Sequence, residues 1–233
     1  MQWLLDEDPD IICIQETKAT GDKLNDALKD FDDYHGYFAS STKTPGFSGV
    51  AIYSKTEPVK VIDNLGYGKY KEEGRILKAE YPDFTLMNIY FPSAGDKLNE
   101  KMQFFNHFLD KTEKLMESDE NVIICGDFNI AHTTNDLANP KDASRNPGFL
   151  QQERGLLDIL IAQGYYDTFR MFNQESGNYT WWPNGYDSRA KNIGMRLDHF
   201  FISENLKDRL KSSLIRSEIM GSDHCPISIE IDI

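Results

Sequence analysis

The stretch Asn121–Asn129 reads NVIICGDFN, an apolar run that stops at a polar turn. After Asn121, the residues VIIC are apolar and three of them are β-branched, which predicts a buried strand. Comparable runs predict further strands at Asp10–Gln15, Gly49–Ser54, Ile76–Glu80, Phe84–Tyr90, Tyr179–Trp182, Leu197–Ser203 and Ile227–Ile233. Apolar residues at helical spacing predict helices at about Lys97–Met116 and Gly148–Gln163. Many strands with a few long helices indicate an α/β domain in which two packed sheets are covered by helices.

The bulk composition is that of a globular protein. The chain has 233 residues, 39% of them hydrophobic, which suits one large domain with a buried core. No apolar run approaches the roughly 18 residues that span a membrane, and no signal peptide is visible. The three cysteines are odd in number and lack CxxC spacing, which predicts free thiols in a reducing interior. We therefore expect a cytoplasmic protein without a membrane partner.

The formal charge of −13 argues against a nucleic-acid partner, because phosphate contacts favour basic surfaces. The argument is weak, since an enzyme needs only a local positive face. Any single basic residue is more often a solvated surface charge than a phosphate contact. The candidates for a local basic face are Lys43, Lys69, Lys71, Arg75, Lys141, Arg145, Arg189 and Lys191.

Asp127 and Asn129 follow the predicted strand Asn121–Cys125 directly. Strand ends form the rim at which α/β proteins build their sites. A carboxylate there can orient or deprotonate water, and an amide can hold a phosphate oxygen. The alternative is an ordinary turn, because Gly, Asp and Asn are common turn residues.

Three other polar clusters lie beside predicted strands. Asp223 and His224 can form a proton-transfer pair, although an exposed loop with a capping Asp is the alternative. Glu16 is placed to bind a hard cation such as Mg²⁺, unless it belongs to a helix N-terminus. Asp198 enters an otherwise apolar strand and needs a partner, unless it is a solvated edge residue. Strand ends on one sheet rim converge in space, so four such clusters favour a site.

Eight segments carry a resemblance to a known family. They are IQETK, NIYFPSAG, GDFNIAH, DLANPK, QER, YTWW, SRAKNIGMRLDHF and GSDHCPI, which cover the chain from Asp10 onward. In this order they resemble the exonuclease III and abasic (AP) endonuclease family of the endonuclease–exonuclease–phosphatase superfamily. GDFN and SDH alone would indicate the superfamily, whereas QETK, SRAKN and RLD point to its DNA repair branch.

The resemblance implies a DNase I-like fold, a four-layer sandwich of two packed mixed β-sheets flanked by helices. It implies a metal-dependent enzyme of base excision repair that uses Mg²⁺, with Mn²⁺ as an alternative, and incises DNA 5′ to abasic sites. A 3′→5′ exonuclease or 3′-phosphatase activity can accompany incision. The implied partner is double-stranded DNA with abasic sites or 3′ ends, and the implied protein is an intracellular, nucleoid-associated monomer.

The resemblance also implies roles for the residues that bind metal and phosphate. Glu16 looks like the metal-binding carboxylate, and Lys18 is placed to hold it. Asp223 resembles the acid near the metal that orders the site. Tyr90 resembles the tyrosine whose hydroxyl meets the phosphate.

Four further residues match the family's proton-transfer group. Asp127 looks like the residue that positions or deprotonates the attacking water, with Asn129 on the scissile phosphate. His224 resembles the phosphate-contacting histidine, and Asp198 the carboxylate that fixes its tautomer. One Mg²⁺ with Asn129, His224 and Tyr90 would neutralise the charge on the phosphate.

The resemblance implies that a last group of residues forms the DNA-binding face. Trp181, Met195 and Leu197 would form a small apolar pocket that accepts a bare sugar and excludes a base. Ordinary sheet packing is the alternative for Trp181 and its neighbour Trp182, at least one of which we expect in the core. Asn146 and Arg189 would contact the DNA.

The family pattern begins with a strand that has no counterpart in this sequence. We therefore expect a single domain over residues 1–233 that is N-terminally truncated relative to the family. Two other functions stay open on this reading. One is a catalytically weak protein that binds DNA lesions, and the other is a superfamily phosphodiesterase that acts on lipid or inositol phosphates.

Overall fold

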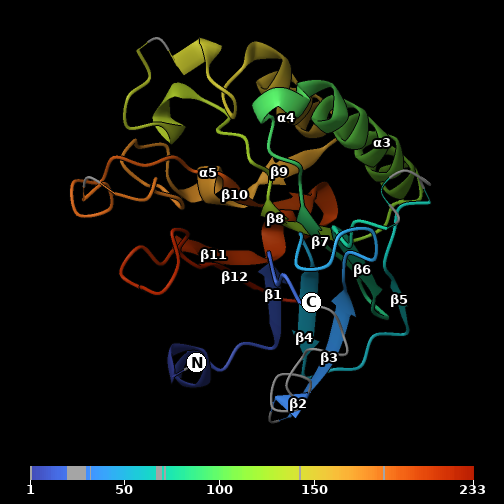
Figure 1. The fold of residues 1–233 in the computed structure, drawn as a ribbon. Helices are drawn as coiled ribbons and strands as arrows, with labels where there is room; N and C mark the ends of the chain where they lie inside the picture. The colour runs from blue at the N-terminus through green and yellow to red at the C-terminus, as the bar shows by residue number, and fades with distance from the viewer. Residues whose placement is uncertain are drawn as a thin grey trace. The chain divides into compact units, whose positions relative to one another are not determined.

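The computed structural model describes residues 2–19, 30–31, 33–66, 70, 72–141, 143–185 and 187–233 (Figure 1). These residues form two compact units, each described separately below. Unit 1 comprises Met1–Tyr90 and Val122–Gly126, and unit 2 comprises Phe91–Asn121 and Asp127–Ile233. The expected single domain remains a prediction, and the candidate DNA contacts Lys69 and Lys71 lie outside the described residues.

Unit 1 is built mainly from strands, which follow a short helix, α1 (Gln2–Glu7). One sheet has the order β1-β4-β3-β2, and every pairing in it is antiparallel. Strands β5, β6, β7 and β8 neighbour one another in that order in a second sheet. The strands are β1 (Ile11–Gln15), β2 (Asp30–Phe31), β3 (Tyr34–Ala39), β4 (Val50–Ser54), β5 (Lys60–Ile62), β6 (Ile76–Glu80), β7 (Thr85–Tyr90) and β8 (Val122–Asp127), whose last residue belongs to unit 2.

A buried amide ties the two sheets of unit 1 together. Asn88 of β7 donates to the carbonyl oxygens of Ile14 and Ala51 at 3.1 and 2.8 Å. Its own oxygen accepts from Gln15 Nε2 at 2.6 Å. Because a buried amide without partners would be destabilising, these three bonds fix how β1 and β4 lie against β7. The end of β1, just before Glu16, is thereby held in place.

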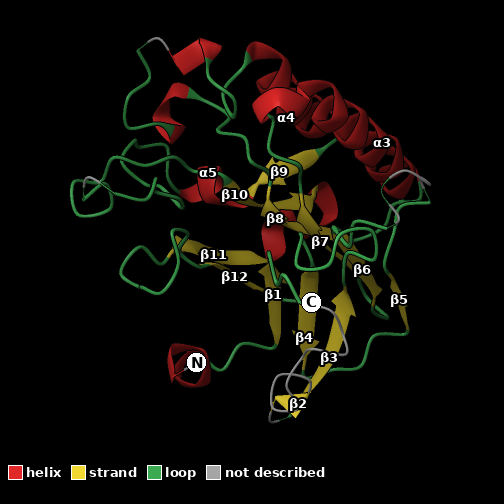
Figure 2. Cartoon of the chain, in the orientation of Figure 1, coloured by secondary structure: helices red, strands yellow, loops and turns green. Residues whose placement is uncertain are grey.

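Unit 2 combines most of the helices with two short antiparallel pairs, β9 with β10 and β11 with β12 (Figure 2). The aromatic face of α3 packs Phe105 and Phe108 against Phe91, and Phe91 stacks on Phe128 at 4.6 Å. This aromatic core supports the residues that follow β8. The elements are α3 (Leu98–Glu117), α4 (Gln151–Ala162), β9 (Tyr165–Asp167), α5 (Thr168–Phe172), β10 (Asp198–Ser203), β11 (Leu210–Ile215), β12 (Ile227–Ile231) and the 3-10 turns Gly95–Lys97, Thr134–Asp136, Ala143–Arg145 and Glu204–Arg209.

The predicted fold class, α/β with packed mixed sheets flanked by helices, is confirmed. The predicted helices and all but one of the predicted strands are present, with shifts of a few residues at their ends. Strands β2, β3, β5, β9 and β11 and helix α5 were not predicted. No helix among the described residues is both long and apolar enough to cross a membrane.

The predicted strand Tyr179–Trp182 is wrong. Trp181 forms only isolated bridges, to Met195 and to His224. The amides of Thr180 and Trp181 both donate to the Met195 carbonyl, while the amide of Trp182 donates to Asp223. Two successive amides on one acceptor break the alternation that a ladder needs, so the apolar pattern packs without extending a strand.

Candidate active site

Asp127 and Asn129 form a closed hydrogen-bonded turn at the end of β8. The backbone amide of Asn129 donates to Asp127 Oδ1 at 2.8 Å, and its side-chain Nδ2 donates to Asp127 Oδ2 at 2.9 Å. Nδ2 also donates to the carbonyl of Phe91 at 3.1 Å. Both N–H groups of this amide are therefore engaged, and Asn129 orients the Asp127 carboxylate. The turn needs Asn129 at φ +52°, a left-handed conformation that Asn tolerates better than most residues.

A buried ion pair between Lys101 of α3 and Glu153 of α4 holds the backbone of this turn. Lys101 Nζ donates to the carbonyl of Asn129 at 2.6 Å and to Glu153 Oε1 at 2.7 Å. Glu153 Oε2 accepts from the amides of Gly148 and Leu150 at 2.7 and 3.1 Å. Both side chains are 0% exposed. The pair thus connects two helices to the backbone of Asn129.

His224 and Asp198 form the pair that the sequence predicted. His224 Nδ1 lies 2.8 Å from Asp198 Oδ2, and Asp198 is the first residue of β10. Thr180 Oγ1 accepts from the amides of Leu197 and Asp198 at 2.9 and 3.0 Å, which fixes the start of that strand. With Nδ1 directed at a carboxylate, the other ring nitrogen, Nε2, is the one available to a ligand.

The charges of this group set its protonation. Burial and, after it, repulsion by the Asp198 carboxylate raise the pKa of Asp127 to about 7, although His224, Asn129 and Lys101 oppose the rise. For His224, burial lowers the pKa, but Asp198 outweighs it, and the net pKa rises to about 10. Near neutral pH, Asp127 can therefore lose its proton, whereas His224 in the same unit stays protonated.

In unit 1, Glu16 gathers a second group of predicted residues just after β1. Tyr90 Oη donates to Glu16 Oε1 at 2.6 Å, and Lys18 Nζ lies 2.7 Å from Glu16 Oε2. The expectation that Lys18 holds the Glu16 carboxylate is confirmed. Glu16 and Lys18 adopt φ values of +55° and +49°, which non-glycine residues rarely do. The backbone amides of Thr17 and Lys18 donate to the carbonyls of Gly49 and Ser48, just before β4. These two hydrogen bonds hold the backbone of Glu16 and Lys18 in this conformation.

The acidic residues of both units fit a hard cation. The Lys18 ammonium beside Glu16 stands where a cation would, and Lys18 is exposed enough to move away. In unit 2, the Asp223 carboxylate accepts two long bonds, from Trp181 Nε1 at 3.2 Å and from Ser222 Oγ at 3.3 Å. Within the described residues, no three His, Cys, Asp or Glu side chains gather as a metal cluster. A single carboxylate such as Glu16 or Asp223 is a ligand type that suits Mg²⁺, which keeps waters and takes substrate phosphate.

The three residues predicted to line a sugar pocket lie together in unit 2. Leu197 is buried in a cluster with Ala131, Leu137, Ala143 and Phe149, and Trp181 and Met195 pack against it as partly exposed members. Trp182, by contrast, is a core residue at 3% exposure. The structure thus confirms that one tryptophan of the pair is core and leaves the other at the surface beside Met195.

The remaining predicted contacts differ in their surroundings. Asn146 is exposed after the turn Ala143–Arg145, where its carbonyl accepts from Phe149. Arg189 is half-buried and directs its guanidinium to a neighbouring loop. Arg75 does not belong to an exposed basic face, because its side chain is 6% exposed and pairs with Glu73 at 2.7 Å. The candidates that are exposed are Lys43, Lys141, Arg145 and Lys191.

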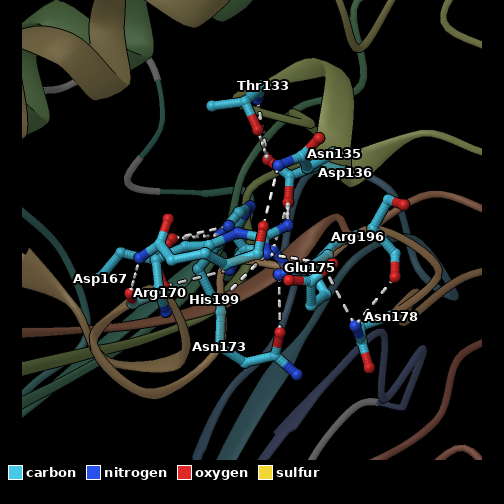
Figure 3. Close-up of polar contacts among 12 residues, drawn as sticks. Thr133, Asn135, Asp136, Asp167, Arg170, Asn173, Glu175, Asn178, Arg196 and His199 are labelled. Atoms are coloured by element: carbon cyan, nitrogen blue, oxygen red, sulfur yellow. Dashed lines mark hydrogen bonds and ion pairs between the residues drawn. The ribbon is translucent and has the colours of Figure 1, made fainter.

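A buried network of charged residues near the start of β10 was not predicted from the sequence (Figure 3). Arg196 donates to Asp136 at 2.7 Å and to both oxygens of Asp167 at 2.6 and 3.1 Å. Arg170 adds a bond to Asp136 at 2.5 Å. Burial acts to raise the pKa of Asp136 and Asp167, but Arg196 outweighs it and holds both well below their usual range. The network anchors the residues just before Asp198.

One signal could have found part of what was missed. Lys101 precedes Phe104, Phe105 and Phe108 by three, four and seven residues, a spacing that places it on the apolar face of α3. A charged residue on that face requires a buried partner. No such pattern in the sequence indicates the hydrogen bonds of Thr180 or Arg189, because their partners lie in loops that form only in the folded chain.

Comparisons with known proteins identify the family. The model of the "Endonuclease/Exonuclease/phosphatase family" matches residues 1–224. The exodeoxyribonuclease of Bacillus subtilis is 37% identical over 239 residues, spanning 100% of this chain and 92% of the relative. Recombination repair protein 1 of Drosophila melanogaster is 39% identical over 231 residues, which cover 97% of this chain but only 34% of the fly protein.

A solved structure extends the agreement to the fold. The AP endonuclease from Archaeoglobus fulgidus superposes with a TM-score of 0.90 at 25% identity, covering 100% of this chain and 92% of that chain. The predicted DNase I-like fold is thereby confirmed.

Proposed function

Because this chain belongs to the Endonuclease/Exonuclease/phosphatase family, we propose that it is a Mg²⁺-dependent phosphodiesterase that incises DNA 5′ to abasic sites. It is a hydrolytic nuclease of the exonuclease III and AP endonuclease type, and nucleases of this family are generally metal-dependent. One observation carries the proposal. A buried carboxylate with a raised pKa, Asp127, is oriented by Asn129 and shares its unit with an imidazole that Asp198 fixes.

Asp127 is the proposed base. A carboxyl group with a pKa near 7 is ionised in a substantial fraction of molecules at neutral pH and is basic enough to accept a proton from water. Both of its oxygens are fixed by Asn129, so its lone pairs are already aimed. In this role Asn129 acts by orienting Asp127, and an additional contact of Asn129 with the phosphate stays a prediction.

His224 is the proposed partner of the phosphate. Its pKa of about 10 keeps it protonated at neutral pH, and its positive charge neutralises a non-bridging oxygen as charge develops there. Asp198 holds the ring and stabilises the imidazolium. Glu16 in unit 1 and Asp223 in unit 2 are each a proposed ligand of Mg²⁺, which would supply further neutralisation of phosphate charge when bound. Tyr90, bonded to Glu16, would add a hydroxyl donor.

Double-stranded DNA with an abasic site is the proposed substrate. Flipping out a nucleotide that lacks its base sacrifices little stacking. Trp181 and Met195, partly exposed beside the buried Leu197, are the proposed apolar surface for the bare sugar. The exposed Lys141, Arg145 and Lys191 are the proposed phosphate contacts, together with Asn146, which follows Arg145 directly.

Cleavage of a fluorescent duplex with one tetrahydrofuran abasic analogue tests the proposal. We expect incision 5′ to the lesion with Mg²⁺, none with EDTA, and a loss of at least about a hundredfold in Asp127→Ala. Asp158→Asn is the matched control, because Asp158 is an exposed carboxylate of α4 in the same unit and pairs with His132. Duplexes with a recessed 3′ end or a 3′-phosphate measure the proposed exonuclease and phosphatase activities in the same assay.

Two outcomes would contradict the proposal. Binding to the lesion duplex without incision in Mg²⁺ would make the chain a lesion-binding protein. Incision that persists in Asp127→Ala at the wild-type rate would remove Asp127 from the reaction and require another base.

A further inference from the structure

Arg189 directs its guanidinium into the loop that precedes Asp223. Its Nη1 donates to the carbonyl of Ser222 at 2.9 Å. Its Nη2 donates to the carbonyls of Ser217 and Ile219 at 3.0 and 2.6 Å. One side chain thus bonds three carbonyls within six consecutive residues, and the guanidinium carbon lies 4.5 Å from the centre of the Trp182 ring.

The same loop carries two residues of the proposed site. Asp223 and His224 follow Ser222 directly, and the amide of His224 donates to Ser222 Oγ at 3.1 Å. The carbonyl of Asp223 accepts from the amide of Trp182 at 3.0 Å. The tryptophan beneath the Arg189 guanidinium therefore also fixes the backbone at Asp223.

Few other contacts hold this loop among the described residues. The side chains of 217–218 and 220–223 are exposed, so the loop has little apolar burial of its own. A segment of this kind keeps one conformation only if its backbone is bonded elsewhere. Arg189 supplies that bonding from a position 28 to 33 residues earlier in the chain.

We propose that Arg189 is a positioning residue that fixes the loop Ser217–Ser222 and, through it, the placement of Asp223 and His224 during phosphodiester cleavage. This inference rests on the proposed function. Arginine is required rather than lysine, because a planar fork bonds several acceptors at once and stacks on an aromatic ring, whereas an ammonium on a flexible stem does neither as well.

This role differs from the DNA contact that the sequence suggested for Arg189. A guanidinium that reached for a phosphate would give up its three carbonyls and its contact with Trp182. A phosphate contact contributes about one unit to the slope of log K against log salt concentration, whereas a loop-holding residue contributes nothing to it. The two roles are therefore separable by experiment.

The test compares Arg189→Lys and Arg189→Gln with Lys211→Gln, an exposed charge removal in the same unit where Lys211 pairs with Asp232. The lesion duplex is bound in EDTA over a range of NaCl concentrations, and kcat and KM are measured with Mg²⁺. We expect both Arg189 variants to lose kcat by on the order of tenfold to a hundredfold, since small displacements of catalytic groups have such effects. Their salt slope should stay at the wild-type value.

Hydrogen exchange on the free protein provides a readout without DNA. The amides of residues 217–224 should exchange faster in Arg189→Gln than in the wild type or in Lys211→Gln, with amides of α3 unchanged. A salt slope reduced by about one with kcat retained would overturn the inference and make Arg189 a phosphate contact. Unchanged exchange in the loop would overturn it as well. If the wild type itself fails to cut, the proposed function fails, while the exchange result still decides whether Arg189 holds the loop.

Discussion

At the scale of single residues, the site depends on how pairs of charged groups shift one another. Asp198 accepts from the His224 ring and also raises the pKa of Asp127 by repulsion, so one carboxylate acts on both proposed catalytic groups. The strand-end positions of Asp127, Asp198 and Glu16 could be predicted from their apolar neighbours. The role of Asn129 as the group that orients Asp127 could not, because it depends on a left-handed turn.

The pH profile of cleavage should report this pair of groups. Activity requires ionised Asp127 and protonated His224, so kcat should fall below about pH 7 and again above about pH 10. In Asp198→Asn both limbs should move to lower pH, because Asp127 loses a repelling carboxylate and His224 loses its stabilising one. Initial rates across pH 5–11 measure both limbs. If neither limb moves in Asp198→Asn, groups other than Asp127 and His224 control the pH profile.

At the scale of elements, α3 and α4 are joined by a charge pair in an apolar setting. Burial lowers the pKa of Lys101, and Glu153 opposes that change by attraction. Helical spacing predicted α3 and its phenylalanine face well. The pairing of Lys101 with Glu153 could not be predicted, because the two residues lie 52 positions apart and a surface location is the usual one for either.

Removing one member of this pair should destabilise the protein more than removing both. Lys101→Met leaves Glu153 as a buried unpaired charge, and the expected loss in the free energy of unfolding is about 3–5 kcal/mol. The double variant Lys101→Met, Glu153→Met should recover a large part of that loss. Urea unfolding followed by circular dichroism measures all the variants. If the single changes are as mild as an exposed substitution such as Asp158→Asn, the pair does not support the fold.

At the scale of the whole molecule, the proposed catalytic groups are divided between the two compact units. Glu16, Lys18 and Tyr90 belong to unit 1, and Asp127, Asn129 and His224 belong to unit 2. The chain passes between the units at Tyr90–Phe91, at Asn121–Val122 and within β8, at Gly126–Asp127. The order of motifs along the sequence predicted the family and fold class, whereas this division depends on contacts that no local pattern reveals.

Global stability should fall in acid despite the net charge of −13. Asp136 and Asp167 have folded-state pKa values below their unfolded values, so their contribution is present above the unfolded pKa, about 4, and is lost as pH falls through the folded pKa. Acid also protonates surface carboxylates and so weakens their mutual repulsion, which favours the folded state, but salt screens this effect. In Asp136→Asn the free energy of unfolding should be lower at pH 7, and the gap to wild type should narrow towards pH 3. A gap of constant size would contradict this account.

Glu16, Lys18 and Asn129 share the left-handed backbone that glycine adopts most easily. Under the proposed function, adaptation to heat meets a conflict at these three positions, since replacement by glycine would relax the backbone and delete a side chain with a proposed role in the reaction. A library selected for heat tolerance alone should therefore accept glycine at Lys18, where the positive φ disfavours any other side chain and the lysine side chain is 60% exposed.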